Sequence, residues 1–259
     1  MSHVVIETAD GVATLWLNRP DLHNAFDDGL IAEVTKGLDT LANDPAVRVV
    51  LLAGKGKSFS AGADLAWMKR MAGYSPGQNE ADAMALATML HRLNTLPKPS
   101  IALVQGAALG GGVGLVAACD MAIAAEDAAF ALSETKLGLI PSVISPYVIA
   151  AIGVRAARRY MLTAERFDAA KAEALGLVSA VVPVDRLMAE GMCLADLLRQ
   201  NGPQAVGEAK SLIAFVAGRP NDPELRAETA RRIARMRATA EGREGVAAFL
   251  EKRKPSWRD

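Results

Sequence analysis

The sequence is short of cysteine, histidine and aromatic residues, and it has no excess of charge of either sign. Its 259 residues include two cysteines and three histidines, and aromatic residues make up 5%. Cys119 and Cys193 lie in apolar surroundings without metal-binding spacing, which predicts buried thiols in a reducing compartment. The histidines are scattered, so we expect no metal site. Lysine plus arginine and aspartate plus glutamate both number 29, which argues against a nucleic-acid partner bound through phosphate contacts.

Long uninterrupted apolar runs are also absent. The start, "MSHVVIETADGVATLWLNRP", lacks a basic segment followed by an apolar stretch, so we expect no signal peptide, no membrane partner and a cytoplasmic location. Hydrophobic residues make up 51% and charged residues 22%, which is typical of a globular protein with a sizeable core. Because aromatic residues are few, aliphatic side chains must fill that core.

Strand and helix patterns alternate in the first half of the chain. Residues 3–20 predict a hairpin that turns at Asp10 and Gly11. Buried strands are predicted at 47–54, 100–107 and 121–125, with helices at 28–41, 80–96 and 112–120. From about residue 142 the strand patterns nearly vanish and helices dominate. The sequence therefore predicts an α/β core in residues 1–200 and a helical region in residues 201–259.

Four glycines gather between Gly110 and Gly114, directly after a predicted strand. They do not fit the dinucleotide pattern G-x-G-x-x-G, because Leu115 stands where the third glycine belongs. A phosphate-binding P-loop ending at "GKS" fails in the same way, because Leu51 replaces its first glycine. No G-x-S-x-G nucleophile motif is present either. The glycines therefore serve another kind of backbone chemistry.

A second loop of small residues, 55–64, follows the strand predicted at 47–54. Small residues between a strand and a helix allow a ligand to reach backbone N–H groups at a helix N-terminus. Two such loops side by side would aim two N–H groups at one oxygen, the geometry that stabilises an enolate or a tetrahedral oxyanion. The alternative is that both loops are ordinary tight turns of an α/β domain.

The segments "SFSAGADL", "VQGAALGGGVGL", "FALSETKLGLIP" and "GVAAFLEKRKPSW" together resemble the crotonase superfamily, the enoyl-CoA hydratase/isomerase family, over nearly the whole chain. The resemblance implies an α/β fold, a crotonase-like spiral of ββα repeats with a C-terminal α-helical trimerisation region. It implies a homotrimer, or a hexamer built as a dimer of trimers. It also implies an acyl-CoA thioester substrate, so that coenzyme A is part of the substrate and no separate cofactor is needed.

The resemblance also assigns roles to individual residues. The backbone N–H groups of Ala63 and Gly111 match the two donors to the thioester oxygen, and Glu134 matches a catalytic glutamate. Small neighbours, Gly110 and Gly114 among them, leave room for the acyl chain. The positions that match coenzyme A contacts are Lys57, Ala61, Asp64, Leu65, Phe249 and Lys252, the last two reaching a neighbouring subunit's site. The alternative for Lys57 and Lys252 is that they are solvated surface lysines. The alternative for Phe249 is that it belongs to the core or to an interface.

Ordinary hydratases of this family use a second glutamate, and that position aligns with Gly114. A single carboxylate is typical of Δ3,Δ2-enoyl-CoA isomerases. The segment after Pro141, together with the glycine at 114, is instead similar to hydratases acting on 3-methylglutaconyl-CoA and isohexenylglutaconyl-CoA. We therefore expect a hydratase that adds water across the C2=C3 bond of a branched or dicarboxylic enoyl-CoA.

In this interpretation Glu134 handles both the attacking water and the proton at C2. Apolar neighbours such as Phe130, Leu132 and Leu139 would raise its pKa toward neutrality, and Tyr147 could position the water or the substrate. The alternatives are a Δ3,Δ2-enoyl-CoA isomerase and a non-catalytic protein that binds acyl-CoA or RNA.

Overall fold

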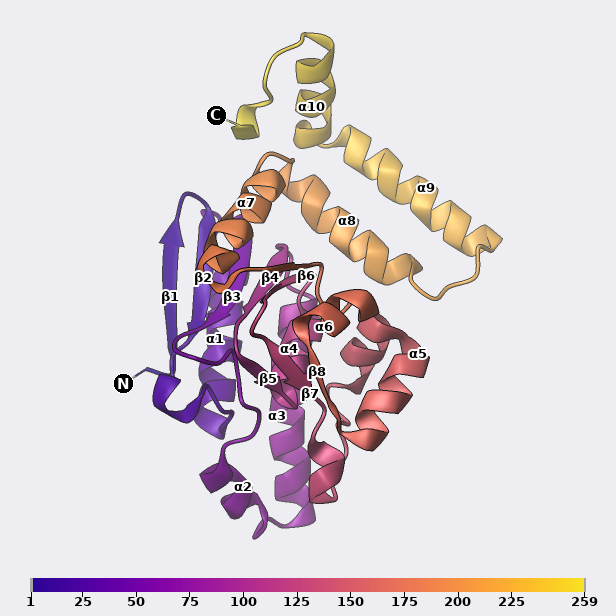
Figure 1. Cartoon of the computed structure of the whole chain (residues 1–259). Helices are drawn as coiled ribbons and strands as arrows, with labels where there is room; N and C mark the ends of the chain where they lie inside the picture. Colours follow the sequence, from indigo (N-terminus) through magenta and orange to yellow (C-terminus); the bar gives the residue numbers. More distant parts are fainter. Residues whose placement is uncertain (1, 259) are drawn as a thin grey trace.

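The computed structural model describes residues 2–258 and contains two β-sheets surrounded by helices (Figure 1). In the larger sheet, β1 and β2 form an antiparallel hairpin, as expected, and the remaining neighbours run parallel. The spatial order of its six strands is β1 (Val4–Ala9), β2 (Val12–Leu17), β3 (Val49–Gly54), β4 (Ser100–Val104), β6 (Met121–Ala125) and β9 (Ala180–Val182).

The smaller sheet lies beside the first and has three short strands. Its spatial order is β5 (Ala107–Leu109), β7 (Ala129–Ala131) and β8 (Arg166–Asp168). Strands β8 and β9 correct the expectation that strands nearly vanish after residue 142. Each has only 3 residues, which is too short to produce a readable alternation of apolar and polar side chains.

The helices of the described chain connect and cover these sheets (Figure 1). They are α1 (Asp28–Asn43), α2 (Leu65–Met71), α3 (Pro76–Asn94), α4 (Gly111–Ala118), α5 (Ser145–Thr163), α6 (Ala169–Leu175), α7 (Leu187–Arg199), α8 (Pro203–Val216), α9 (Pro223–Ala238) and α10 (Ala240–Leu250). A strand of the large sheet, a strand of the small sheet and a helix recur in that order, as β4–β5–α4 and β6–β7–α5. The expected spiral of ββα repeats is therefore confirmed.

The central strands β3 and β4 of the large sheet are buried on both faces, which explains the continuous apolar runs of these strands. Val50 and Leu52 of β3 point into the cluster that includes the buried faces of α1 and α3, whereas Val49 and Leu51 point toward α7. Side chains alternate between the two faces along a strand, so each strand needs apolar residues at every position. Fully burying each such side chain contributes about 1.5–3 kcal/mol.

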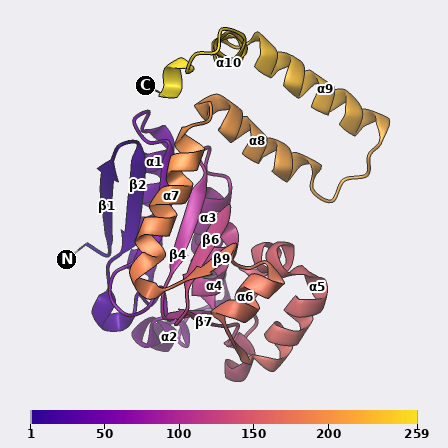
Figure 2. The same cartoon turned by 45° about the horizontal axis from the view of Figure 1, so that its top comes forward.

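Helices α8, α9 and α10 stand apart from the two sheets in both views (Figures 1 and 2). An ion pair between Lys210 Nζ on α8 and Asp120 Oδ2 after α4, 2.8 Å apart, joins this helical region to the core. Within residues 2–258, no helix combines the length and the apolar character needed to cross a membrane.

The two cysteines differ in their surroundings. Cys119 is buried, and burial raises the pKa of its thiol to about 12. Cys193 is exposed on α7, which corrects the expectation that both thiols are buried. Its apolar neighbours in sequence belong to the opposite, inward side of an amphipathic helix.

Candidate active site

Two loops that follow neighbouring strands meet at one edge of the large sheet. Strands β3 and β4 pair in parallel, so both chains leave the sheet at the same edge. Ser60 N–H then donates to the carbonyl of Ala107 (2.9 Å), and Leu109 N–H donates to the carbonyl of Ser60 (2.9 Å). The prediction that the two loops of small residues lie side by side is therefore confirmed.

Phe26 holds the backbone around Ala63 in a strand-like arrangement. Phe26 N–H donates to the carbonyl of Gly62 (2.7 Å), and Asp64 N–H donates to the carbonyl of Phe26 (2.8 Å). Ala63 lies between these two bonds, and its own N–H finds no acceptor within residues 2–258. Gly62 has a φ of +86°, and a Cβ there would lie 2.9 Å from the carbonyl oxygen of Leu109. Only glycine fits this position.

Gly111 is the first residue of α4, so its N–H has no partner inside the helix. It also finds no acceptor elsewhere in the part of the chain that the structure describes. Glycine allows a close approach here, since a Cβ on Gly111 would lie 3.1 Å from Cε2 of Phe26. Because the N-terminus of a helix favours negative charge, this N–H is well placed to stabilise an anionic oxygen.

A cavity of about 450 Å³ opens where the two loops meet, and both Ala63 and Gly111 line it. This volume is within the range of small-molecule sites. Most of its wall is apolar, and Glu134 is the one acidic or basic side chain among the described residues of the lining. The remaining lining residues are Phe26, Ala61, Gly62, Leu65, Trp67, Met68, Met71, Ala83, Leu86, Gly110, Ser133, Leu137, Leu139, Ile140, Pro141, Ser142, Val143 and Ile144.

A larger groove of about 1000 Å³ lies between α1 and α3. Its lining comes from the sides of these helices, at residues such as Thr35, Asp39 and Thr88. The backbone N–H groups in the interior of a helix are already bonded, so this groove offers no free pair of donors. We therefore place the active site at the smaller cavity.

Glu134 reaches the cavity from a 3-10 helix, Glu134–Leu137, that follows β7. Its carboxylate approaches Gly110 so closely that a Cβ on that glycine would lie 3.0 Å from Oε1. Gly110 also has a φ of +50°, so glycine is required there for two reasons. The other carboxylate oxygen, Oε2, is buried and lacks a hydrogen-bond partner within residues 2–258.

Burial raises the pKa of Glu134 above its usual 4.5, opposed only by a bond from its own backbone N–H. Phe130 and Leu132 are fully buried, as the predicted apolar environment requires, whereas Leu139 is half exposed where it lines the cavity. A carboxyl with a raised pKa and a free oxygen is suited to take up and release a proton.

Gly114 does not line the cavity. It is buried in α4, and Ile144 covers it. The position predicted to match a second glutamate is therefore separated from the cavity by Ile144, which lines it. The prediction that Gly114 borders the acyl group does not fit this geometry, because the side chain of Ile144 lies between Gly114 and the cavity.

The other predicted site residues fall into three groups. Ala61 and Leu65 line the cavity. Asp64 lies beside it, but its Oδ1 caps α2 by accepting from Ala66 and Trp67 N–H. The residues outside the lining are Lys57 on an exposed loop, half-buried Tyr147 on α5, and the exposed Phe249 and Lys252 at the end of α10.

The sequence-based reasoning missed Phe26 and Arg19. Phe26 packs against Gly111 and bonds on both sides of Ala63, so it connects the two donors. Arg19 joins the carboxylates of Asp27 and Asp64. Asp27 is the N-cap of α1, and its position directly after an apolar residue was the available signal for Phe26.

A sequence profile described as enoyl-CoA hydratase/isomerase matches residues 7–259. The chain is 47% identical to an enoyl-CoA hydratase from Shewanella pealeana, whose crystal structure matches with a TM-score of 0.96 over 98% of this chain and 96% of that one. It is 31% identical to 2,3-dehydroadipyl-CoA hydratase of Escherichia coli, covering 100% of this chain and 99% of that protein. It is also 34% identical to a mitochondrial Delta(3,5)-Delta(2,4)-dienoyl-CoA isomerase of Dictyostelium discoideum, covering 94% and 86%.

Proposed function

Because the chain belongs to the enoyl-CoA hydratase/isomerase family, we propose that its cavity adds water across the C2=C3 bond of an enoyl-CoA thioester. One observation carries the proposal. The N–H groups of Ala63 and Gly111 and the carboxyl of Glu134 border the same apolar cavity, and neither N–H is used inside the described chain.

In the proposed reaction, the thioester carbonyl oxygen accepts hydrogen bonds from Ala63 and Gly111. Glu134 takes a proton from water while the water oxygen bonds to C3. The electron pair of the C2=C3 bond moves toward the carbonyl, and an enolate forms whose oxygen the two N–H groups stabilise. Removing one such donor typically costs about 10²–10³ in turnover.

Glu134 then returns the proton to C2, the enolate collapses to the thioester, and the carboxylate is regenerated. One hydrogen and one hydroxyl have been added, and the enzyme is unchanged. The raised pKa of Glu134 supports this double role, because a stronger carboxylate base accepts the water proton more readily. Neither step requires a further cofactor, so coenzyme A enters as part of the substrate.

The cavity supports a branched apolar acyl group better than a dicarboxylic one. Met68, Met71 and Leu86 form a pliable apolar wall between α2 and α3. No lysine or arginine side chain lines the cavity in the described residues, so a tail carboxylate would lack a charge partner. The relative from Escherichia coli is named for a dicarboxylic substrate. A comparison of turnover between acyl groups with and without a terminal carboxylate is therefore informative.

The second candidate function is a Δ3,Δ2-enoyl-CoA isomerase. A single carboxyl that faces the acyl chain is sufficient to move a proton between C2 and C4, and the covered Gly114 leaves Glu134 without a second carboxylate. A binding-only role for acyl-CoA or RNA would leave unexplained why a carboxyl with a raised pKa and two free N–H groups border the same cavity. Zero net charge also disfavours RNA.

Assembly completes the proposal. We propose a homotrimer or hexamer in which Phe249 and Lys252 reach the coenzyme A site of a neighbouring subunit. In this proposal the loop of Ala61, Asp64 and Leu65 holds the adenine end of coenzyme A, and Lys57 lies near its phosphates. Val246, Phe249 and Leu250 are 59%, 82% and 72% exposed on α10 in the single chain, and this cluster of exposed apolar side chains supports an interface there.

The test is turnover on crotonyl-, 3-methylcrotonyl-, 3-methylglutaconyl- and 3-enoyl-CoA in water labelled with heavy oxygen. A hydratase places the label at C3 of the product, whereas an isomerase shifts the double bond without taking up label. We expect label in the 3-hydroxyacyl product and faster turnover of the branched apolar thioester. Double-bond migration without label would make the chain an isomerase.

A further inference from the structure

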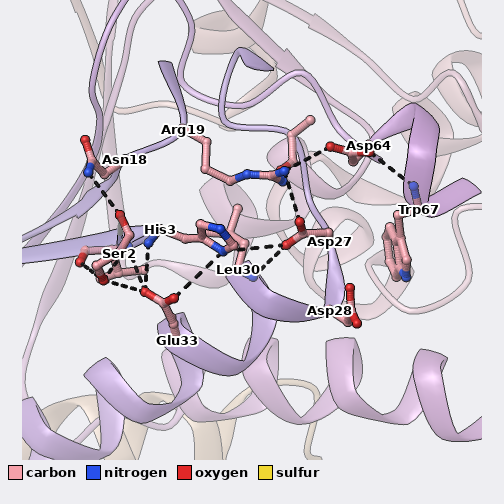
Figure 3. Close-up of polar contacts among 12 residues, drawn as sticks. Ser2, His3, Asn18, Arg19, Asp27, Asp28, Leu30, Glu33, Asp64 and Trp67 are labelled. Carbon is pink, nitrogen blue, oxygen red and sulfur yellow. Dashed lines mark hydrogen bonds and ion pairs between the residues drawn. The ribbon is translucent and has the colours of Figure 1, made fainter. Parts of the chain in front are cut away.

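Arg19 occupies the centre of a charged cluster beside the cavity (Figure 3). Its side chain is 11% exposed, and it follows β2 before the short helix Pro20–Leu22. One guanidinium nitrogen, Nη2, lies 2.9 Å from Asp27 Oδ2 and 3.0 Å from Asp64 Oδ2. The other, Nη1, donates to the carbonyl of Ala25 at 2.6 Å. A single buried cation therefore holds three points of the chain.

The carboxylates of Asp27 and Asp64 each use one oxygen to cap a helix and the other oxygen to contact Arg19. Oδ1 of Asp27 caps α1 by accepting from Leu30 N–H at 2.7 Å, and Oδ1 of Asp64 caps α2 by accepting from Ala66 N–H at 2.8 Å. The Oδ2 atom of Asp64 then accepts from Arg19 Nη2, and the Oδ2 atom of Asp27 forms an ion pair with the same nitrogen. Figure 3 shows both aspartates turned toward the guanidinium, with Trp67 at the start of α2 beside Asp64. Arg19 thus joins the starts of two helices.

The backbone between these two caps carries the proposed donor. Segment 25–27 bonds to Gly62 and Asp64 through Phe26, and Ala63 lies between those bonds. The ring of Phe26 also lies against Gly111. The position of Ala63 N–H relative to Gly111 N–H therefore depends on where segment 25–27 sits, and Arg19 holds that segment at Ala25 and Asp27.

The charges explain why an arginine is needed. Two aspartates with little exposure face one another across Arg19, and without the cation they would repel. Burial would raise the pKa of Asp64, but the N–H groups of Trp67 and Ala66, together with Arg19, hold its pKa below the usual value. Guanidinium has a planar fork of donors that can reach several oxygens at once, whereas a lysine ammonium acts as a compact point charge.

We infer that Arg19 is a positioning residue for the oxyanion hole, which sets the direction of Ala63 N–H by clamping the N-caps of α1 and α2 together. This inference rests on the proposed role of Ala63. Arg19 does not line the cavity and acts only through the backbone that it holds. Because a displacement of about 1 Å at a reacting centre can cost about 10²-fold in rate, losing the clamp should lower kcat far more than it changes KM.

The experiment compares Arg19→Met, Arg19→Lys and Asp27→Ser with the parent. Serine keeps the N-cap of α1 but has no carboxylate to form the ion pair with Arg19, so Asp27→Ser remains informative if Arg19→Met fails to fold. The control is Arg92→Met, which removes an exposed Arg–Asp pair (Arg92 Nη1 to Asp39 Oδ1, 3.3 Å). The readouts are kcat and KM for hydration, thermal melting, and the near-ultraviolet absorbance of the enolate formed by bound acetoacetyl-CoA.

We expect Arg19→Met and Asp27→Ser to lose kcat by about 10²-fold and to lose the enolate absorbance while still binding the thioester. Arg19→Lys should fall between these variants and the parent. An enolate signal and a kcat equal to those of Arg92→Met, in folded Arg19→Met or Asp27→Ser, would overturn the inference. If the parent forms the enolate but does not hydrate enoyl-CoA, the proposed function fails while the enolate assay still decides the role of Arg19.

Discussion

Ile144 fills the space beside Gly114. A Cβ placed on Gly114 would overlap Cγ2 of Ile144 and lie 2.9 Å from its Cβ. Gly114 is buried in α4, and Ile144 precedes α5, so the contact joins two helices of successive repeats. The pair explains physically why this chain has one carboxyl in its cavity: a glutamate at 114 would need the volume that Ile144 occupies.

Replacing Gly114 with alanine should therefore destabilise the protein. Alanine gains about 1 kcal/mol of helix propensity over glycine, but overpacking a buried site costs about 1–3 kcal/mol. We expect Ile144→Ala to relieve the overlap, so that the double variant is more stable than the sum of the single effects predicts. A double-mutant cycle by urea denaturation measures this coupling. Additive effects would show that Ile144 does not confine Gly114.

Ala63→Pro should lower turnover by about 10²–10³, because proline removes the backbone N–H that is proposed to bind the thioester oxygen. The measurement is steady-state hydration together with circular dichroism to establish that the variant is folded. Ala61→Pro is an unsuitable control because Ala61 N–H bonds to the carbonyl of His23, so Ala63→Ser, which keeps the N–H, is the matched variant. Full turnover in folded Ala63→Pro would remove Ala63 from the mechanism.

The thermal stability of Glu134→Gln relative to the parent should depend on pH. Burial raises the pKa of Glu134 above its usual 4.5. At a pH between 4.5 and the raised pKa, the folded protein therefore binds more protons than the unfolded chain. Stability from this group is present below pH 4.5 and is lost as pH rises through the raised pKa. Glutamine carries no such cost, so the melting temperature of the variant should match the parent in acid and exceed it at neutral pH. A difference independent of pH would contradict this.

Phe249→Ser should weaken assembly while leaving the single chain folded, because Phe249 is exposed and contributes little to its own core. Sedimentation velocity across a range of concentrations measures the change, and binding of acyl-CoA should weaken with it if a neighbouring subunit completes the site. Leu162→Ser, at a leucine 74% exposed on α5, is the matched control. Unchanged assembly in Phe249→Ser would remove the end of α10 from the interface.

The parts of the site that sequence could predict are those fixed by local chemistry. Small residues after a parallel strand and before a helix predicted the two loops, because strand order and helix termini constrain where such backbone can lie. The family resemblance then identified Ala63 and Gly111 within these loops. The raised pKa of Glu134 followed from its apolar neighbours. Strands β8 and β9 were not predictable, because they are formed by pairing with distant strands rather than by a local pattern.

The charged cluster around Arg19 could not be predicted from the sequence for a related reason. Arg19 and Asp64 are far apart in the sequence, and contacts between the segments that follow each strand, such as the bond from Phe26 N–H to the carbonyl of Gly62, bring them together. The closure of Gly114 by Ile144 depends in the same way on packing between two helices. Composition and spacing show which residues are present. Contacts between residues that are distant in the sequence can be identified only when the path of the folded backbone is known.

The most direct test of the central claim is Glu134→Gln, assayed for hydration and for thioester binding in parallel. Glutamine keeps the size of the side chain but cannot shuttle the proton, and general acid–base catalysis contributes about 10²–10⁴-fold. With Glu173→Gln, an exposed site on α6, as the control, we predict a loss of turnover by at least that factor with nearly unchanged acyl-CoA binding. Turnover at the parent rate in Glu134→Gln would show that Glu134 is structural and would contradict the account.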